Sequence, residues 1–112
     1  MLVILFRSRL TEAAGTDYTA MDQELEASAR QAPGFVDLKS YSASDGERLT
    51  VVRWKDAETL RAWREYPRHR EAQRVGRERW YQWYKIEVAE LTREGSFARD
   101  GSSGLDRVPR GD

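Results

Sequence analysis

One segment of this chain must be covered on both sides, and it begins at the second residue. Residues Leu2 to Phe6 are all large and apolar. Because strand side chains alternate between the two faces of a sheet, a strand of this kind is buried on both faces. The run is far too short to cross a membrane. We therefore expect a strand with helices on one face and a second cover on the other.

The segment after this strand predicts an amphipathic helix. Apolar residues recur there at helical spacing, with polar residues between them: Tyr18, Met21, Leu25 and Ala29. Pro33-Gly34 ends the helix, since neither residue continues one well.

Two strands joined by a tight turn follow. Asp45-Gly46 is typical of a hairpin turn that needs a positive φ, and it lies between residues Phe35–Ala43 and Glu47–Trp54. Strict alternation in the first of these strands places Phe35 on the face opposite to Leu38. The pattern predicts an antiparallel pair.

A second helical region is interrupted once before the last strand. Asp56 is a suitable N-cap for it. Tyr66-Pro67 breaks it, because a residue before proline is pushed toward extended geometry. A further helical segment is expected from about Arg68 to Tyr81. The last strand is indicated by apolar residues that alternate with polar or small ones: Tyr84, Ile86 and Val88.

The order strand-helix-strand-strand-helix-strand predicts an α+β fold of the ferredoxin-like type, with a four-stranded antiparallel sheet and helices on one face. A second copy of the chain is the economical cover for the other face, which would pair two sheets into a dimeric α+β barrel. We assign residues 1–93 to this domain. Residues 94–112 contain Gly and Ser and form either a flexible tail or an arm on a partner subunit.

Composition excludes several classes of protein. Lys+Arg and Asp+Glu both total 19, so the net charge is zero and no nucleic-acid partner is expected. There is no cysteine and one histidine, which excludes thiolate zinc sites, a cysteine nucleophile and an all-histidine metal site within one chain. We expect no cofactor, no metal and no membrane association. The N-terminus lacks the layout of a signal peptide, so a cytoplasmic protein is expected.

Several stretches together resemble the antibiotic biosynthesis monooxygenase-like (ABM) domain family, which consists of small dimeric α+β barrels. The resemblance covers about residues 1–93. It rests on Arg7–Leu10, Ala32–Phe35, Trp54, Ala62-Trp63, Tyr66–Gln73 and Gly76–Glu78. It implies a homodimer and, first among functions, cofactor-independent oxygenation of a small aromatic phenol or quinol. The alternative is a non-catalytic or ligand-sensing dimer.

Heme binding is the third function found among proteins that this chain resembles. The heme-degrading members carry an asparagine near the end of the first strand, a tryptophan on the second helix and a ligand histidine ten residues later. Trp63 matches the tryptophan, but Gln73 stands in place of the histidine. The first-strand position falls on Ser8, or on Arg7 if the register slips by one. Heme degradation is therefore not expected.

A cofactor-free oxygenase needs an apolar pocket, a base and a donor that stabilises a phenolate. Five residues of the second helical region share one helix face: His69, Ala72, Gln73, Gly76 and Trp80. We predict that this face lines a pocket against the sheet. His69 is the predicted catalytic base, because histidine titrates near neutral pH. Gln73 is a predicted substrate-binding residue. The alternative for His69 is an exposed or helix-capping histidine.

Three further residues are predicted to bind the substrate: Ser8, Trp63 and Tyr66. Ser8 alternates with Arg7 and Arg9, so it takes the helix side of the first strand. Trp63 would form a pocket wall or simply part of the core, and Tyr66 would place a hydroxyl at the pocket lip. Either arginine could neutralise an anionic substrate or form a salt bridge at the rim.

An unusually aromatic stretch lies where the last helix meets the last strand. We predict that Trp80, Trp83 and Tyr84 anchor the dimer interface, since large aromatic residues often dominate interfaces. Lining of the pocket is the alternative for this stretch.

Overall fold

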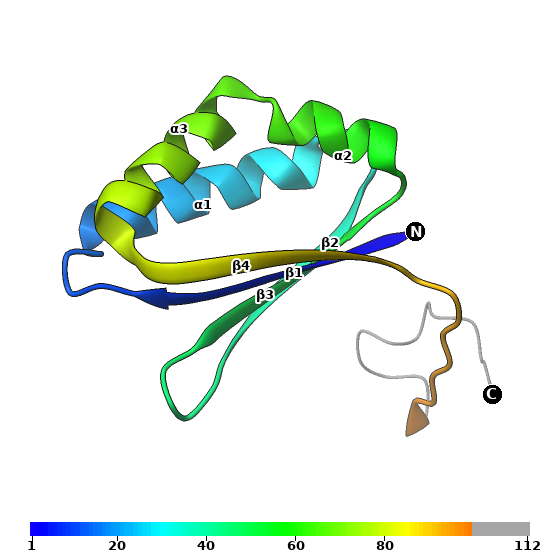
Figure 1. Ribbon diagram of the computed structural model, residues 1–112. Coiled ribbons are helices and arrows are strands. Elements are labelled where there is room, and N and C mark those ends of the chain that lie inside the picture. Colours follow the sequence, from blue (N-terminus) through cyan, green and yellow to red (C-terminus); the bar gives the residue numbers. More distant parts are fainter. Residues whose placement is uncertain (100–112) are drawn as a thin grey trace.

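The computed structural model of the chain describes residues 1–99 and forms one antiparallel sheet with helices packed on one side (Figure 1). Its elements are β1 (Leu2–Leu10), α1 (Thr16–Gln31), β2 (Phe35–Ser42), β3 (Arg48–Trp54), α2 (Ala57–Arg64), α3 (Pro67–Val75), the π-helical turn η1 (Gly76–Trp80) and β4 (Tyr81–Glu90). The strand order is β2-β3-β1-β4. The predicted ferredoxin-like α+β fold is confirmed.

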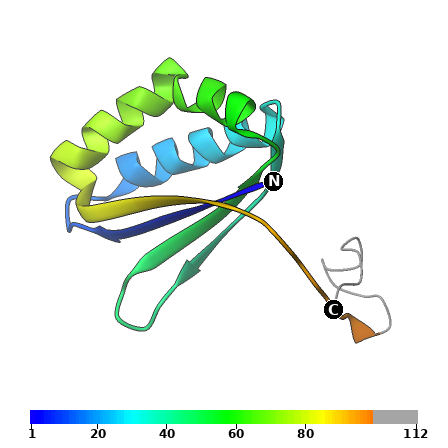
Figure 2. The same cartoon turned by 45° about the vertical axis from the view of Figure 1, so that its right-hand side comes forward.

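β1 lies inside the sheet, antiparallel to β3 on one side and to β4 on the other. The register places Phe6 beside Thr50 of β3 and Ile86 of β4. All three α-helices lie on the side to which Phe6 points, and among residues 1–99 no helix lies on the other side (Figures 1 and 2). Leu5 and Arg7 point to this uncovered face, because side chains alternate along a strand.

The prediction that Phe35 and Leu38 lie on opposite faces is wrong. The register between β2 and β3 shifts between Phe35 and Asp37, so an irregularity interrupts the alternation. Phe35 consequently joins Leu38 on the helix side and packs edge-on against Trp54, with ring centroids 5.7 Å apart. A β-bulge re-aims a side chain in this way without changing the sequence pattern around it.

A chain of hydrogen bonds fixes the start of α2 against the end of β3. The predicted N-cap Asp56 accepts a hydrogen bond from the backbone nitrogen of Thr59 at 2.8 Å. The Thr59 hydroxyl donates to Asp56 at 2.7 Å and accepts from the indole nitrogen of Trp54 at 3.0 Å. Gly34 reaches this junction with a φ of +87°, a conformation that favours glycine. The indole nitrogen of Trp54 and the hydroxyl of Thr59 are therefore both paired.

The predicted break at Pro67 separates α2 from α3, but the helical region ends differently from the prediction. α3 continues into the π-helical turn η1, and β4 begins at Tyr81 rather than near Tyr84. Gly76 allows this geometry, because a Cβ atom there would lie 2.6 Å from Cε2 of Tyr81. The absence of a side chain lets the Tyr81 ring pack directly against the helix.

Beyond β4 the chain leaves the sheet. The backbone nitrogen of Leu91 donates to the carbonyl of Met1 at 2.9 Å, and the following residues run away from the helical layer (Figure 1). The division at residues 93 and 94 stays a prediction, and residues 100–112 of the expected tail or arm lie outside the described residues. Within residues 1–99, no helix has the length and apolar character needed to span a bilayer.

Candidate functional site

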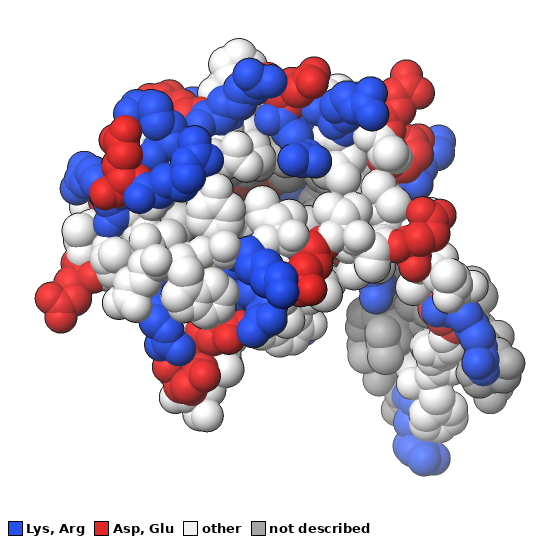
Figure 3. Space-filling view, in the orientation of Figure 1, with Lys and Arg blue, Asp and Glu red and all other residues white. Residues whose placement is uncertain are grey.

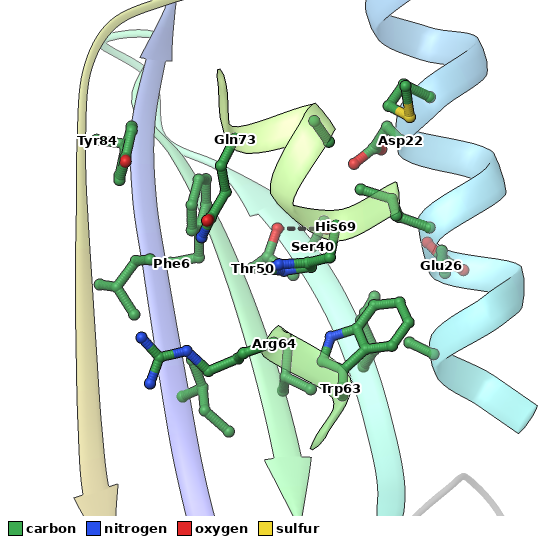
Figure 4. A pocket seen from close by; sticks show the side chains of 18 of the residues that line it. Phe6, Asp22, Glu26, Ser40, Thr50, Trp63, Arg64, His69, Gln73 and Tyr84 are labelled. Carbon is green, nitrogen blue, oxygen red and sulfur yellow. Dashed lines mark hydrogen bonds between the residues drawn. The ribbon is translucent and has the colours of Figure 1, made fainter. Parts of the chain in front are cut away.

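A cavity of about 200 Å³ lies between the helices and the sheet. Its walls are mostly apolar and aromatic side chains from both layers, including Phe6, Leu25, Val52, Trp63 and Ile86 (Figure 4). A dry apolar cavity of roughly 150 Å³ is enough to bind benzene. The space therefore suits an aromatic ligand of one or two rings.

His69 lies inside this cavity, in the first turn of α3. Its ring meets the Trp63 ring edge-on, with centroids 5.2 Å apart. In the described part of the chain, the buried Nδ1 atom of His69 has no hydrogen-bond partner. Burial lowers the pKa of His69 below its usual value and the Arg64 guanidinium lowers it further, while the Arg64 backbone opposes this shift. The neutral imidazole, which can accept a proton, is therefore the form favoured at neutral pH.

Trp63 is held in place by a row of stacked aromatic rings. Its ring centroid lies 6.1 Å from that of Trp54 and 5.8 Å from that of Tyr66, both in stacked geometry. Trp63 lines the cavity, as predicted for a pocket wall. Tyr66 is 44% exposed and lies outside the residues that line the cavity, so it supports Trp63 from the solvent side.

The structure brings Gln73 to the cavity but not Ser8. Gln73 follows His69 by one helical turn and points toward the sheet (Figure 4). Ser8 takes the helix side of β1 as expected, but it is only 2% exposed and lies beside Tyr84, outside the cavity lining. The cavity lies nearer the start of β1, where the Phe6 side chain forms part of its wall.

Sequence reasoning missed the polar residues that other elements contribute. Ser40 of β2 and Thr50 of β3 share a hydrogen bond of 2.9 Å on the cavity wall. Asp22 and Glu26 enter from α1, and Arg64 enters from α2 (Figure 4). The sequence pattern could have identified this hydroxyl pair, because Ser40 and Thr50 alternate with residues that point to the other face of the sheet.

The two ends of the cavity carry opposite charge. Asp22 and Glu26 lie along α1, while Arg64 lies on the α2 side (Figure 4). Burial raises the pKa of Asp22, and Glu26 adds to this effect, while Arg48 opposes it. Any polar ligand in the cavity is therefore in an asymmetric field.

The two arginines of β1 do not reach the cavity. Arg7 points to the uncovered face of the sheet and pairs with Glu47, with 2.7 Å between Nε and the carboxylate. Arg9 lies 3.8 Å from the carboxylate of Asp45 in the hairpin turn. Both arginines therefore form salt bridges, but these lie away from the cavity rather than at its rim.

The three predicted interface residues are divided between the two faces of the sheet. Trp80 is 4% exposed in the helix-side core, where its indole nitrogen donates to Asp17 at 3.1 Å. Tyr84 lines the cavity and stacks on Phe6 at 5.5 Å. Trp83 is 37% exposed on the uncovered face, beside the Arg7 guanidinium. Strand alternation separates Trp83 from Tyr84, and the π-helical turn carries Trp80 into the core.

Among residues 1–99, no three His, Asp or Glu side chains lie together in a way that could hold a metal ion.

Relatives of this chain share its fold and part of its sequence. YqjZ of Bacillus subtilis (strain 168), described as an uncharacterised protein, is 30% identical over 82 residues, covering 73% of this chain and 72% of that protein. A Deinococcus radiodurans protein described as a "putative antibiotic biosynthesis monooxygenase" has a TM-score of 0.76 at 12% identity, covering 88% of this chain and 99% of that one. Rv0793 of Mycobacterium tuberculosis has a TM-score of 0.74 at 18% identity, covering 85% and 98%.

At such low identity the two solved structures establish the fold alone. The family follows from sequence, because the pattern of the family described as antibiotic biosynthesis monooxygenase matches residues 1–75, from β1 to the end of α3. With this match over most of the domain, the chain belongs to the antibiotic biosynthesis monooxygenase (ABM) family.

Proposed function

We propose that this protein oxygenates a small aromatic phenol or quinol in the cavity, without a cofactor, and that His69 is the catalytic base. The observation that carries the proposal is His69, which lines an apolar cavity of aromatic size and whose buried Nδ1 atom has no hydrogen-bond partner among residues 1–99. A buried polar atom without a partner is unfavourable unless a ligand satisfies it. A phenolic O–H is the donor that it lacks.

The proposed reaction needs no external reductant. His69 accepts the phenolic proton, and a ring carbon of the phenolate forms a bond to O₂. The O–O bond then breaks, so that one oxygen atom becomes a new carbonyl of the quinone and the other leaves as water. All four electrons that reduce O₂ come from the phenol. The protein contributes the base, the orientation of the ring and the exclusion of water.

Other cavity residues would orient the substrate. Phe6 and Trp63 offer ring faces on opposite layers of the cavity, and the Gln73 amide can donate a hydrogen bond to a developing anion. Burial raises the pKa of Tyr18 and that of Tyr81, so both phenols keep their protons at neutral pH. They therefore remain hydrogen-bond donors beside the cavity.

The test is oxygen consumption with a panel of phenols, quinols and naphthols. We expect uptake of one O₂ per molecule of phenol converted to quinone, and one labelled oxygen atom in the product when ¹⁸O₂ is used. Label from H₂¹⁸O in that position, after correction for carbonyl exchange, would contradict the mechanism. If no compound of the panel supports oxygen consumption, the alternative of a non-catalytic or ligand-sensing dimer is favoured.

Heme degradation is not part of this proposal. A carboxamide, Gln73, faces the cavity at the position where the heme-degrading relatives carry a ligand histidine. We expect weak hemin binding and no turnover in the presence of a reductant. Conversion of hemin to an open-chain product by the wild-type protein would contradict this expectation.

We further propose that a second copy of the chain covers the open face of the sheet. Half-exposed Leu5 and Val51 lie on this face, and Trp83 is 37% exposed there. Several charges on this face are paired, as in Arg7 with Glu47 and Lys85 with Glu87, which reduces the repulsion between two approaching copies. Apolar surface that is internally neutral is typical of self-association.

Sedimentation of the wild-type protein and of Trp83→Asp tests the dimer. We expect a wild-type dimer at micromolar concentration and a large shift toward monomer in the variant, because it places a charge within the apolar contact. Tyr66→Asp, on the helical side, is the matched control and should stay dimeric. A monomeric wild-type protein would contradict the proposal.

A further inference from the structure

The mouth of the cavity lies between α2, α3 and β4, and it continues into a second depression on the surface. Four residues line both spaces: Leu60, Arg64, Gln73 and Val88. The floor of the mouth is apolar and open to solvent, since Ile86 is 38% exposed and Val88 is 49% exposed. A ligand in the cavity would therefore extend over β4 toward this depression.

Arginines surround this depression. Arg61, Arg64, Arg70 and Arg77 line it, against the single carboxylate of Glu65. Figure 3 shows basic side chains gathered along the helical rim above a hollow in the same view as Figure 1. A chain of zero net charge thus has a locally positive surface at the entrance to its cavity.

These four arginines differ from the others in the same helical region. Within residues 1–99, no carboxylate lies within 4.0 Å of any of the four guanidinium groups. In contrast, Arg68 lies 2.6 Å from Glu24, and Arg74 lies 3.3 Å from Glu78. The charges of these paired arginines are balanced by carboxylates, whereas those of the mouth arginines are not, although Arg77 donates a hydrogen bond to the Tyr84 hydroxyl at 3.2 Å.

We propose that the ligand of this cavity is an aromatic oxyanion, with its ring in the cavity and its carboxylate, sulfonate or phosphate group at the arginines of the mouth. Arg64 is the central residue, because it lines both the cavity and the depression. A guanidinium group presents a planar fork of donors that matches these anions. This ligand class would be the substrate class of the proposed oxygenase, and it rests on that proposed function.

The charges at the far end of the cavity impose an orientation. Asp22 and Glu26 lie along α1, where Arg30 pairs with Glu26 at 3.1 Å and Arg48 acts on Asp22 (Figure 4). Arg64, in contrast, has no carboxylate partner within residues 1–99, so an anionic group is favoured at the Arg64 end. His69 lies between the two ends, on α3. A ring that carries an anionic group at one end and a hydroxyl at the other would place the hydroxyl away from the mouth, toward the interior that His69 faces.

Binding measurements test this inference without relying on turnover. Quenching of tryptophan fluorescence by three probes would be compared: neutral 2-naphthol, 6-hydroxy-2-naphthoate and 6-hydroxynaphthalene-2-sulfonate. The carboxylate and sulfonate arms distinguish the two oxyanion chemistries. At low ionic strength we expect at least one anion to bind about tenfold more tightly than 2-naphthol, the size of effect that a charged hydrogen bond supports. Added salt should reduce this preference.

The double variant Arg64→Gln/Arg70→Gln should lose the preference for the anion and keep its affinity for 2-naphthol. The matched control is Arg74→Gln, which removes an arginine of the same helical region that is already paired with Glu78. It should keep the preference. Equal binding of all three probes by the wild-type protein would overturn the inference, and so would a preference that survives in the double variant.

The outcomes separate this inference from the proposed function. Preferential binding of an anion without oxygen uptake would refute the oxygenase and leave the ligand class standing. Oxygen uptake with neutral phenols and no preference for anions would refute the anionic ligand class and leave the oxygenase standing. Tight binding of a short duplex DNA, lost in the double variant, with no binding of the naphthalene probes, would assign the arginines to nucleic acid and overturn the inference.

Discussion

Two neighbouring regions between the helices and the sheet are built in opposite ways. At the junction of β3 and α2, Trp54 is completely buried and its indole nitrogen is bonded to Thr59 at 3.0 Å. In the adjacent cavity, Nδ1 of His69 has no partner in the described part of the chain, and about 200 Å³ is unfilled. The first region is satisfied by the chain itself, whereas we propose that a ligand fills the second.

Trp63 connects the two regions. It stacks on Trp54 at 6.1 Å and meets His69 edge-on at 5.2 Å. The filled junction thereby fixes one wall of the cavity and one side of the imidazole ring. Rigid support of this kind is what positions a functional group accurately. The contrast predicts that changes at the junction alter stability, while changes in the cavity alter binding and turnover.

The largest expected effect is that of Gly34→Ala at the junction. A Cβ atom there would collide with the Thr59 side chain, would lie 2.7 Å from the Trp54 indole nitrogen, and would be attached to a backbone with a φ of +87°. We expect a loss of about 3 kcal/mol or more in the free energy of unfolding, measured by urea denaturation.

Gly15→Ala is the matched control for this substitution. No atom lies within 4 Å of the Cβ position at Gly15, so alanine meets no collision there, and the expected cost is that of changing the N-cap residue of α1. We expect a change of less than about 1 kcal/mol. Equal effects of the two substitutions would show that the junction is not the rigid region that the comparison requires.

His69→Gln should have the largest effect on turnover. Removing the base is expected to lower the oxidation rate of a confirmed substrate by about 10²-fold. Stability at neutral pH should change little, because the Nδ1 atom makes no hydrogen bond in the described structure. Steady-state rates and urea denaturation measure the two effects. Full activity in the variant would refute the assignment of His69 as base.

Asp56→Ala should weaken the junction by less than Gly34→Ala. It removes the N-cap of α2 and one partner of the Thr59 hydroxyl. We expect a loss of about 1 kcal/mol in the free energy of unfolding, typical of a helix cap, with turnover per folded molecule preserved. A large fall in turnover at unchanged stability would contradict the division between the two regions.

Apart from the Gly15→Ala control, Trp63→Phe is expected to have the smallest effect of these substitutions. Phenylalanine keeps an aromatic ring beside Trp54 and His69 but leaves part of the cavity wall open. The affinity for a naphthol should fall several-fold, with a smaller change in the maximal rate, as determined from initial rates over a range of substrate concentrations. A large fall in the maximal rate with unchanged affinity would show that Trp63 acts mainly through His69.

Much of the fold could be predicted because each element carries its own local signal. The positive φ of Gly46, the cap at Asp56 and the break at Pro67 all depend on neighbouring residues alone. The irregularity that turns Phe35 and the early start of β4 could not be predicted. Both depend on contacts with distant residues, such as that between Gly76 and Tyr81.

The candidate site was only partly predictable for the same reason. The helix face of His69 and Gln73 follows from spacing, so sequence places both residues on the cavity. Asp22 and Arg64 belong to other elements, and their distance from the cavity depends on how those elements pack. Whether an arginine in this region is paired or unpaired with a carboxylate also depends on three-dimensional neighbours, so the sequence alone does not separate the two groups of arginines.

The most direct test of the account follows the NMR signals of the only histidine in the chain. We expect the imidazole of His69 to titrate below its ordinary pKa of 6.5, because burial and Arg64 disfavour the charged form while Asp22 and Glu26 lie across the cavity. The unfolded chain then binds this proton at a higher pH than the folded protein. The contribution of His69 to stability should therefore be complete above pH 6.5 and fall as the pH drops below that value.

The same signals report directly on the cavity. Addition of 6-hydroxy-2-naphthoate should shift the Nδ1 resonance of His69 in the wild-type protein, because the account places a phenolic donor at that atom. A low pKa together with this shift is the predicted result. Titration at or above pH 6.5, with no change in the imidazole signals at saturating ligand, would contradict the claim that His69 is a buried base awaiting an aromatic ligand.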